Sequence, residues 1–257
     1  MKALLSRLFS IVQAAPVSAQ CPVCKGEGIS FTPLDDYYRA NAKANGYKYF
    51  GQGEMTALET YSCNACGASD RERLYAHWLE QMLAKGHFGN GARLIHFSPE
   101  PALARLIKQK QLFNYSTADL VMEGVDHHVD LMDLPFENES VDFFICSHVL
   151  EHVPDDRQAI RELFRITRKG GLGILMAPII VGLQRTDEET EPCSASERWR
   201  RFGQDDHVRL YAHADYLQRI RESGFELSLL DRTHFGAQTF KNLGLKDSSI
   251  LYIVSRT

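Results

Sequence analysis

From residue 92 onward, short apolar runs alternate with segments in which apolar residues recur every three or four positions. Runs of the first kind predict buried strands, and segments of the second kind predict amphipathic helices. The expected strands are 92–97, 113–118, 127–131, 141–147, 172–178, 225–231 and 248–256, and the expected helices are 100–110, 155–171 and 213–224. Such alternation indicates an α/β domain, in which helices cover a mostly parallel sheet.

The helix expected at 155–171 begins at an Asp cap and ends at the pair Gly170-Gly171. A further helix is expected at 70–86, where Gly86 is the stop and the apolar positions are Leu74, Trp78, Met82 and Leu83. We interpret residues 71–90 as a connecting helix. Residues 20–70 are rich in Gly, Tyr and polar residues with weak periodicity, so a core is not expected there without a metal.

Composition narrows the class of protein. With 257 residues, 44% hydrophobic and 24% charged, the chain can form one sizeable core and a small additional module. Disordered and collagen-like proteins are excluded. The formal net charge of −4 argues against a broad basic face that coats nucleic acid, although a local patch is compatible with it.

Four of the six cysteines form two CxxC pairs, "CPVCKGEG" and "CNACGAS". Four thiolates satisfy the tetrahedral preference of zinc, and the nearby glycines let backbone amides turn toward the sulfurs. We therefore expect a zinc-ribbon module at residues 20–70 with a structural Zn²⁺ on Cys21, Cys24, Cys63 and Cys66. A closed four-ligand set leaves no catalytic position. Free thiols, disulfides and a redox pair are the alternatives.

Residues 1–19 allow two interpretations. A Lys, an apolar stretch and the triplet Val17-Ser18-Ala19 are typical of a secretory signal, but Arg7 interrupts the apolar stretch. An amphipathic helix with Leu4, Leu5, Leu8 and Val12 is expected instead, because only a cytoplasmic protein suits reduced zinc thiolates. Peripheral membrane contact through residues 1–15 is a further expectation. No run of about 18 apolar residues predicts a membrane span.

Polar residues follow the ends of several expected strands: Ser98, Asp119, Asp130 with Leu131, and Ser147 with His148. In open parallel sheets, ligands bind at the carboxyl ends of the strands. There Asp119 can accept hydrogen bonds from two ribose hydroxyls. Asp130 can accept one from an adenine amino group, beside the amide of Leu131. The alternative for Asp119 is an ordinary turn residue.

Residues 130–171 resemble the class I S-adenosylmethionine-dependent methyltransferases, in the stretch "DLMDLPFENESVDFFICSHVLEHVPDDRQAIRELFRITRKGG". The likeness extends over residues 91–257. The pair "CPVC" and "CNACG", followed by "LIHFSPEP", is similar to a bacterial subgroup with an N-terminal zinc ribbon. The resemblance implies S-adenosyl-L-methionine as cofactor and a seven-stranded Rossmann-like sheet whose last strand is antiparallel.

One departure concerns the glycine-rich cofactor loop of these methyltransferases, which is replaced here by "HFSPEPALARL". Without glycine, close approach of the backbone to the cofactor is in doubt. Glu100 offers compensation, because its carboxylate could meet the methionine amino group. The alternative is an acid that only favours the helix dipole.

Residues 183–211 interrupt the alternation with a long polar stretch, which we expect to be a lid or substrate wall. Within it, His207 is the candidate general base, and Arg209 or Tyr211 would orient the acceptor. Alternatively, His207 and Arg209 only hold the loop. His148 is a second candidate for contact with cofactor or substrate, whereas His152 and Asp133 are expected to support the neighbouring loops.

The expected function is methyl transfer to an oxygen or nitrogen of a small molecule or glycan. An rRNA or tRNA methyltransferase whose ribbon grips RNA is one alternative, but the ribbon is not basic. Between the outer cysteines it carries Lys25, Arg39, Lys43 and Lys48 against Glu27, Asp35, Asp36, Glu54 and Glu59. The other alternative is a noncatalytic binding protein whose glycine-free loop no longer accepts the cofactor.

Overall fold

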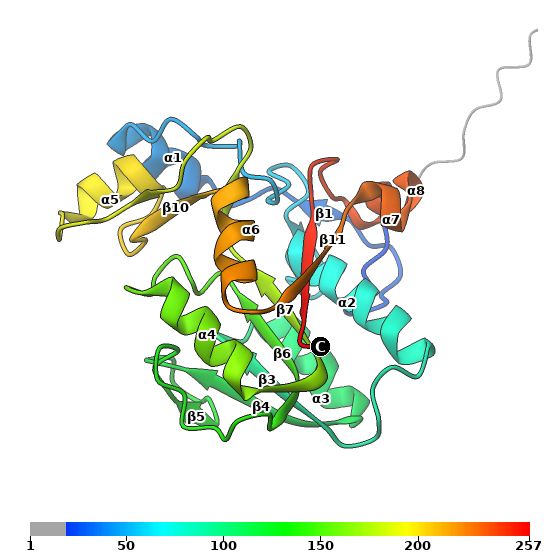
Figure 1. The fold of residues 1–257 in the computed structure, drawn as a ribbon. Coiled ribbons are helices and arrows are strands. Elements are labelled where there is room, and N and C mark those ends of the chain that lie inside the picture. The colour runs from blue at the N-terminus through cyan, green and yellow to red at the C-terminus, as the bar shows by residue number, and fades with distance from the viewer. Residues whose placement is uncertain (1–18) are drawn as a thin grey trace, which may run out of the picture.

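The computed structural model describes residues 19–257. The amphipathic helix and the membrane contact expected near the N-terminus fall in residues 1–15, outside the described residues. The described chain is organised around one seven-stranded sheet with the order β11-β12-β7-β6-β3-β4-β5 (Figure 1). The expected α/β class is therefore confirmed.

Strands β7, β6, β3, β4 and β5 pair in parallel. Their bounds are Ala92–Phe97 for β3, Phe113–Asp119 for β4, His127–His128 for β5, Val141–Ser147 for β6 and Thr167–Met176 for β7. The last strand, β12 (Leu251–Ser255), is antiparallel to both β7 and β11 (Glu226–Leu230), as the resemblance implied. The carboxyl ends of β3, β4 and β6 consequently share one edge of the sheet.

Four expected helices are present, and they cover both faces of the sheet: α4 and α6 lie on one face, α2 and α3 on the other (Figure 1). Their bounds are Asp70–Ala84 for α2, Pro101–Lys110 for α3, Asp156–Ile166 for α4 and His213–Glu222 for α6. A capping box of Ser69 and Glu72 starts α2, and the Asp155 side chain caps α4. Helix α2 packs into the main apolar core through Leu74, Tyr75, Trp78 and Leu79.

The predicted helix end at Gly170-Gly171 is wrong. Helix α4 already ends at Ile166, where the Thr167 hydroxyl donates to the Leu163 carbonyl at 2.6 Å and the backbone turns extended. The two glycines belong to β7 and pair with the end of the chain, because Gly170 N–H donates to Arg256 O at 2.7 Å. The two glycines that follow the helical pattern therefore lie at the irregular start of a strand, and not at the end of a helix.

The N-terminal module consists of the hairpin of β1 (Phe31–Thr32) with β2 (Ser62–Cys63), and of helix α1 (Asp36–Asn45). The Arg73 guanidinium on α2 holds this module to the rest of the chain. It is fully buried and donates to the carbonyl oxygens of Thr60, Tyr61, Ala68 and Leu243. Helices α7 (Arg232–Phe235) and α8 (Ala237–Leu243) were not predicted from the sequence, and α8 supplies the Leu243 carbonyl.

Residues 183–211 were expected to be a long polar loop, but they form a folded insertion. Strands β8 (Ile179–Ile180), β9 (Asp187–Glu188) and β10 (Arg209–Ala212) make a small sheet of order β8-β10-β9, and α5 (Ala195–Phe202) packs beside it. Helix α5 lies against α1, where the rings of Tyr37 and Trp199 are 6.2 Å apart. Within residues 19–257, no helix combines the length and the apolar composition needed to cross a bilayer.

Candidate functional site

A cavity of about 650 Å³ opens where β3, β4 and β6 end, and we call it the strand-end cavity. Its lining includes five of the residues expected to contact cofactor or substrate: Ser98, Asp119, Asp130, Leu131 and His148. These residues come from four separate stretches of the chain. The parallel pairing of the strands brings them together at one edge of the sheet.

Ser98 directly follows β3, in the stretch that replaces the glycine-rich cofactor loop discussed above. Its φ is +48°, a left-handed conformation that favours glycine, and its N–H donates to Ala118 O at 2.8 Å. His148, at the end of β6, is left-handed as well, with φ +56°. Both strand exits therefore make the sharp turn at the cavity without glycine, at the cost of local backbone strain.

Asp119 ends β4 with one carboxylate oxygen engaged. Its Oδ1 accepts the N–H groups of Val121 at 2.8 Å and Met122 at 2.7 Å. No described residue donates to its Oδ2, which leaves that oxygen free for a ligand. Leu120 and Val121 also line the cavity and are 62% and 80% exposed, so apolar surface is available there for a bound ring.

Asp130 shapes the turn that follows β5. Its Oδ1 accepts the Met132 N–H at 2.8 Å, and its carbonyl oxygen accepts the Asp133 N–H at 3.1 Å. The neighbouring Leu131 is buried and contributes to the cavity wall. Asp119 and Asp130 thus reach one cavity from adjacent strand ends.

Glu100 and Ser147 lie in a buried polar network outside the lining of the strand-end cavity. Glu100 Oε2 is 2.8 Å from His96 Nε2, and its Oε1 accepts from Arg71 Nε at 3.3 Å. Burial acts to raise the pKa of Glu100, but His96 and Arg71 outweigh it and hold the pKa at about 2. Ser147 Oγ is 3.1 Å from the Tyr75 hydroxyl.

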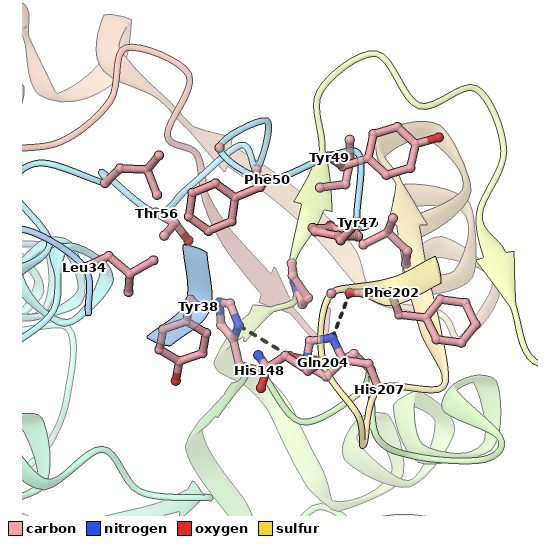
Figure 2. A pocket seen from close by; sticks show the side chains of 18 of the residues that line it. Leu34, Tyr38, Tyr47, Tyr49, Phe50, Thr56, His148, Phe202, Gln204 and His207 are labelled. Carbon is pink, nitrogen blue, oxygen red and sulfur yellow. Dashed lines mark hydrogen bonds and ion pairs between the residues drawn. The ribbon is translucent and has the colours of Figure 1, made fainter. Parts of the chain in front are cut away.

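A second cavity, of about 240 Å³, lies beside the first, and we call it the aromatic cavity (Figure 2). The N-terminal module provides most of its rings and the insertion adds one more: Tyr38, Tyr47, Tyr49, Phe50, Tyr61 and Phe202. His148 and His152 line both cavities. The two spaces therefore adjoin at these imidazoles.

Three imidazoles surround the buried carboxylate of Glu151. His148 Nδ1 is 3.3 Å from Glu151 Oε1, and His207 Nε2 is 3.9 Å from the same oxygen. Burial would raise the pKa of Glu151, but the contact with His148 and the nearby imidazoles lower it to about 2. Burial lowers the pKa of His207, which favours its neutral form.

His207 lines the aromatic cavity, whereas Arg209 and Tyr211 do not. The expectation that Arg209 or Tyr211 orients an acceptor is therefore wrong. The Arg209 guanidinium donates to the carbonyl oxygens of Leu150 at 2.6 Å, Val153 at 2.5 Å and Pro154 at 2.8 Å. These bonds fix the loop that follows β6.

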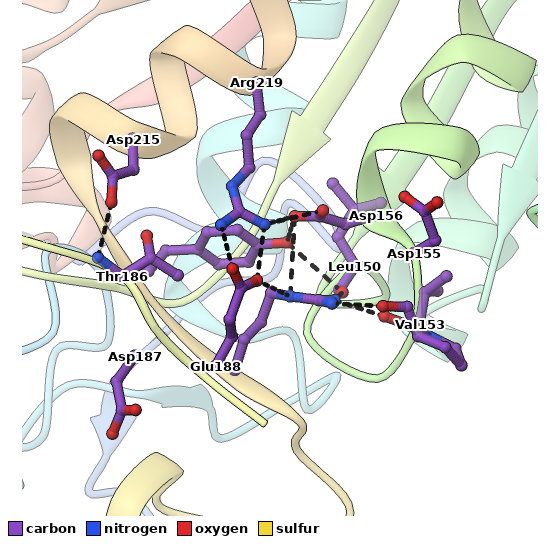
Figure 3. Close-up of polar contacts among 12 residues, drawn as sticks. Leu150, Val153, Asp155, Asp156, Thr186, Asp187, Glu188, Asp215 and Arg219 are labelled. Atoms are coloured by element: carbon purple, nitrogen blue, oxygen red, sulfur yellow. Dashed lines mark hydrogen bonds and ion pairs between the residues drawn. The ribbon is translucent and has the colours of Figure 1, made fainter. Parts of the chain in front are cut away.

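Tyr211 also contacts this loop, and Figure 3 shows Arg219 between Asp156 and Glu188. The Tyr211 hydroxyl donates to Asp156 Oδ2 at 2.5 Å, and Arg219 bridges Asp156 at 2.8 Å and Glu188 at 3.0 Å. Asp156 starts α4 and Glu188 belongs to the insertion. The ion-pair network thus joins the insertion to the sheet domain.

The four CxxC cysteines come together as expected. Cys21 Sγ is 3.6 Å from Cys66 Sγ, Cys24 Sγ is 3.9 Å from Cys63 Sγ, and all four sulfurs lie within 4.8 Å of one another. Sulfurs placed about 2.3 Å from one tetrahedral zinc ion are about 3.8 Å apart. The sulfur positions therefore fit a structural zinc.

Two parts of this site were not predicted from the sequence. The rings of the aromatic cavity come from a region with weak periodicity, so nothing in their spacing linked them to the sheet edge. Glu151 was visible in the "LEH" stretch, where a lone carboxylate sits between a leucine and a histidine. That carboxylate could have been predicted as a site residue, because burying a charged side chain costs free energy unless it has a partner.

Comparisons with known proteins agree with this geometry. Residues 81–175 match the family described as a methyltransferase domain. This match supports the interpretation of the protein as a methyltransferase. The chain is 45% identical over 51 residues to an uncharacterized methyltransferase of Mycobacterium avium (strain 104), covering 20% of each chain. It is 32% identical over 92 residues to an uncharacterized methyltransferase of Mycobacterium leprae, covering 36% of this chain and 31% of the relative. The matched segments thus span a third or less of these relatives.

Solved structures with a similar arrangement include the YcgJ protein from Bacillus subtilis. It has a TM-score of 0.45 and 15% identity, covering 70% of this chain and 99% of that chain. An S-adenosylmethionine-dependent methyltransferase from Mesorhizobium loti has a TM-score of 0.43 and 14% identity, covering 68% and 97% of the two chains.

Proposed function

We propose that the protein transfers a methyl group from S-adenosyl-L-methionine to an oxygen or nitrogen of a small molecule or glycan. One observation carries the proposal: the strand-end cavity, which holds Asp119 and Asp130, and the ring-lined aromatic cavity adjoin at His148 and His152. A methyltransferase needs such a pair of spaces, because donor and acceptor must be held in line during transfer.

On the donor side, the strand-end cavity would hold the cofactor. Asp119 would accept from the ribose hydroxyls through its free Oδ2, and Asp130 would accept from the adenine amino group beside the Leu131 amide. Ser98 would bring the backbone close to the cofactor. Glu100 and Ser147 would contact the methionine part of the cofactor. In this structure Glu100 is hydrogen-bonded to His96, and Ser147 to Tyr75.

On the acceptor side, the aromatic cavity would select the substrate. Its volume of about 240 Å³ is below the usual range for pockets that bind drug-sized ligands, so the acceptor group is small. Aromatic side chains suit the face of a planar or sugar ring. The zinc-bearing module would then serve as a wall of the acceptor site, with Zn²⁺ holding that wall in shape.

In the transfer, the bond between sulfur and the methyl carbon breaks as the bond from the acceptor atom to that carbon forms. The sulfur keeps the bonding electron pair, which leaves S-adenosylhomocysteine, and the acceptor loses a proton. His148 is the better placed proton acceptor, because it lines both cavities. His207 is the second candidate, since burial favours its neutral form and it lines the aromatic cavity.

The test uses S-adenosylmethionine with a labelled methyl group, incubated with separate pools of small molecules, glycans and RNA. We expect wild-type protein to label the small-molecule or glycan pool, and the His148→Asn variant to label it far less. Label confined to RNA would favour the RNA methyltransferase instead. Absence of label from all pools, together with absence of cofactor binding, would favour a noncatalytic binding protein.

A further inference from the structure

Glu151, His152 and His207 form a cluster that methyl transfer alone does not explain. Each offers a ligand atom, and the three atoms lie within 4.8 Å of one another. Glu151 and His152 follow β6, whereas His207 precedes β10. The two segments are joined next to the cluster by a hydrogen bond of 2.8 Å from the Val208 N–H to the Glu151 carbonyl oxygen.

Glu151 is the unusual member of the cluster. Its side chain is 0% exposed, and neither carboxylate oxygen has a hydrogen-bond partner among the described residues. No Lys or Arg of the described chain forms an ion pair with it. Burying a carboxylate without hydrogen-bond donors costs free energy, and a positive charge bound next to Glu151 would offset this cost.

The two imidazoles are held by their outer nitrogens. His152 Nδ1 is 3.4 Å from Asp206 Oδ2, and His207 Nδ1 is 3.3 Å from the Phe202 carbonyl oxygen (Figure 2). Metal-binding histidines usually donate their second ring N–H to a carboxylate or a backbone carbonyl, which frees the other nitrogen for the metal. Here the Nε2 atoms are left to face Glu151, at 4.0 and 3.9 Å from its Oε1.

We propose that Glu151, His152 and His207 bind one divalent transition-metal ion. A cation at about 2.1 Å from each ligand atom spans separations up to about 4.2 Å, so it can bridge Glu151 to either imidazole. Two imidazoles with one carboxylate suit Mn²⁺, Fe²⁺, Co²⁺ or Zn²⁺. The site is chemically distinct from the four thiolates, which select softer ions.

The role of this ion rests on the proposed function. Three protein ligands leave open positions, and Glu151, His152 and His207 all line the aromatic cavity. The ion would therefore act as a Lewis acid on an oxygen of the acceptor and favour loss of its proton. His207 would then serve as a ligand, which leaves His148 as the proton acceptor.

A competing account needs no metal. In it, the imidazole of His148, whose Nδ1 is 3.3 Å from Glu151 Oε1, is the partner of the buried carboxylate. The two accounts differ in one measurable property, because only the first predicts a stoichiometric cation site.

The experiment titrates Mn²⁺ into purified full-length protein whose thiolate site carries zinc, with free Mn²⁺ followed by electron paramagnetic resonance. The wild type should bind one Mn²⁺ per chain. His152→Gln, at a side chain 35% exposed and thus least harmful to folding, should weaken binding at least tenfold, and Glu151→Gln should do the same. The control is His213→Gln, which alters a histidine paired with Glu54 at 3.0 Å.

Unchanged affinity in both cluster variants, or no Mn²⁺ bound by the wild type, would overturn the proposal. Weakened binding in the His213→Gln control would do so as well, because it would show general disruption. The readout does not depend on methyl transfer. Failure of the metal site is therefore separable from failure of the proposed function, which cofactor binding tests.

Discussion

The backbone N–H of Val208 donates a 2.8 Å hydrogen bond to the carbonyl oxygen of Glu151, and this bond joins the insertion to the loop that follows β6. The next residue, Arg209, adds hydrogen bonds to the carbonyl oxygens of Leu150, Val153 and Pro154. Buried carbonyls need such donors, because water cannot reach them. The insertion therefore sets the shape of the loop that carries His148 and His152.

Replacing Arg209 should destabilise the protein. Arg209→Gln removes the guanidinium of a residue that is 3% exposed and leaves the buried carbonyl oxygens of Leu150, Val153 and Pro154 without their charged donor. We expect a loss of about 3 kcal/mol in the free energy of unfolding, the usual scale for breaking a buried charged pair. Urea denaturation followed by circular dichroism measures it.

The matched control is Arg200→Gln on α5, whose partner is the exposed Glu197. It should change the unfolding free energy by less than about 1 kcal/mol, since surface ion pairs contribute little. Equal effects of the two substitutions would contradict the role given to Arg209.

Loss of zinc should weaken the whole fold and not the N-terminal module alone. Cys21 and Cys63 belong to the same apolar core as the sheet and α2. Wild-type protein should carry one zinc per chain, and Cys63→Ser should lose it and melt at a lower temperature, because ligand binding to the native state stabilises it. Elemental analysis and calorimetric melting measure both effects.

Cys193→Ser changes a cysteine outside the cluster and should keep both zinc content and melting temperature. The zinc assignment fails if zinc-replete wild-type protein holds less than half an equivalent. A disulfide between Cys21 and Cys24 under reducing conditions would be equally damaging.

His148 should matter more for turnover than for donor binding. Asn tolerates the left-handed backbone of this position, so His148→Asn removes the imidazole with little added strain. Turnover should fall by roughly 10²–10⁴, the usual contribution of a general base, while cofactor affinity changes little. Once an acceptor is known, steady-state rates and cofactor titration measure the two effects separately. If affinity falls as far as turnover, His148 belongs to the donor site.

The strands of the main sheet were predicted from strong signals in the sequence, whereas their order in the sheet comes from the structure. Apolar runs such as "ARLIHF" and "VDFFICS" are buried on both faces of the sheet, and the resemblance supplied the antiparallel last strand. Helix α1 and the insertion were not predicted, because their residues bury apolar side chains against each other and not against the sheet. Tyr37 and Trp199, for instance, meet only in the folded chain. Each of the two helices is short and buries few residues, Ala42 in α1 and Trp199 with Phe202 in α5.

The cavity residues that follow strand ends were predictable, because the carboxyl ends of parallel strands lie at one edge of the sheet. Ser98, Asp119, Asp130 and His148 follow strand ends, and parallel pairing places all four at one cavity. Glu100 and Ser147 follow strand ends as well, but their side chains point into the buried network with His96 and Tyr75. Position along a strand fixes where a residue lies, whereas its partners decide which way its side chain points.

The central claim is that the strand-end cavity binds S-adenosylmethionine through Asp119, and isothermal titration calorimetry tests it most directly. Asp119→Asn keeps an oxygen for the Val121 and Met122 amides but loses the carboxylate oxygen that would accept from the ribose. Glu123→Gln is the control, because it removes an exposed carboxylate from the same loop and lies outside the cavity lining. The account predicts binding to the wild type and to Glu123→Gln, with affinity lower by about 1–3 kcal/mol in Asp119→Asn. Wild-type protein that binds no S-adenosylmethionine, or a folded Asp119→Asn variant with unchanged affinity, would contradict it.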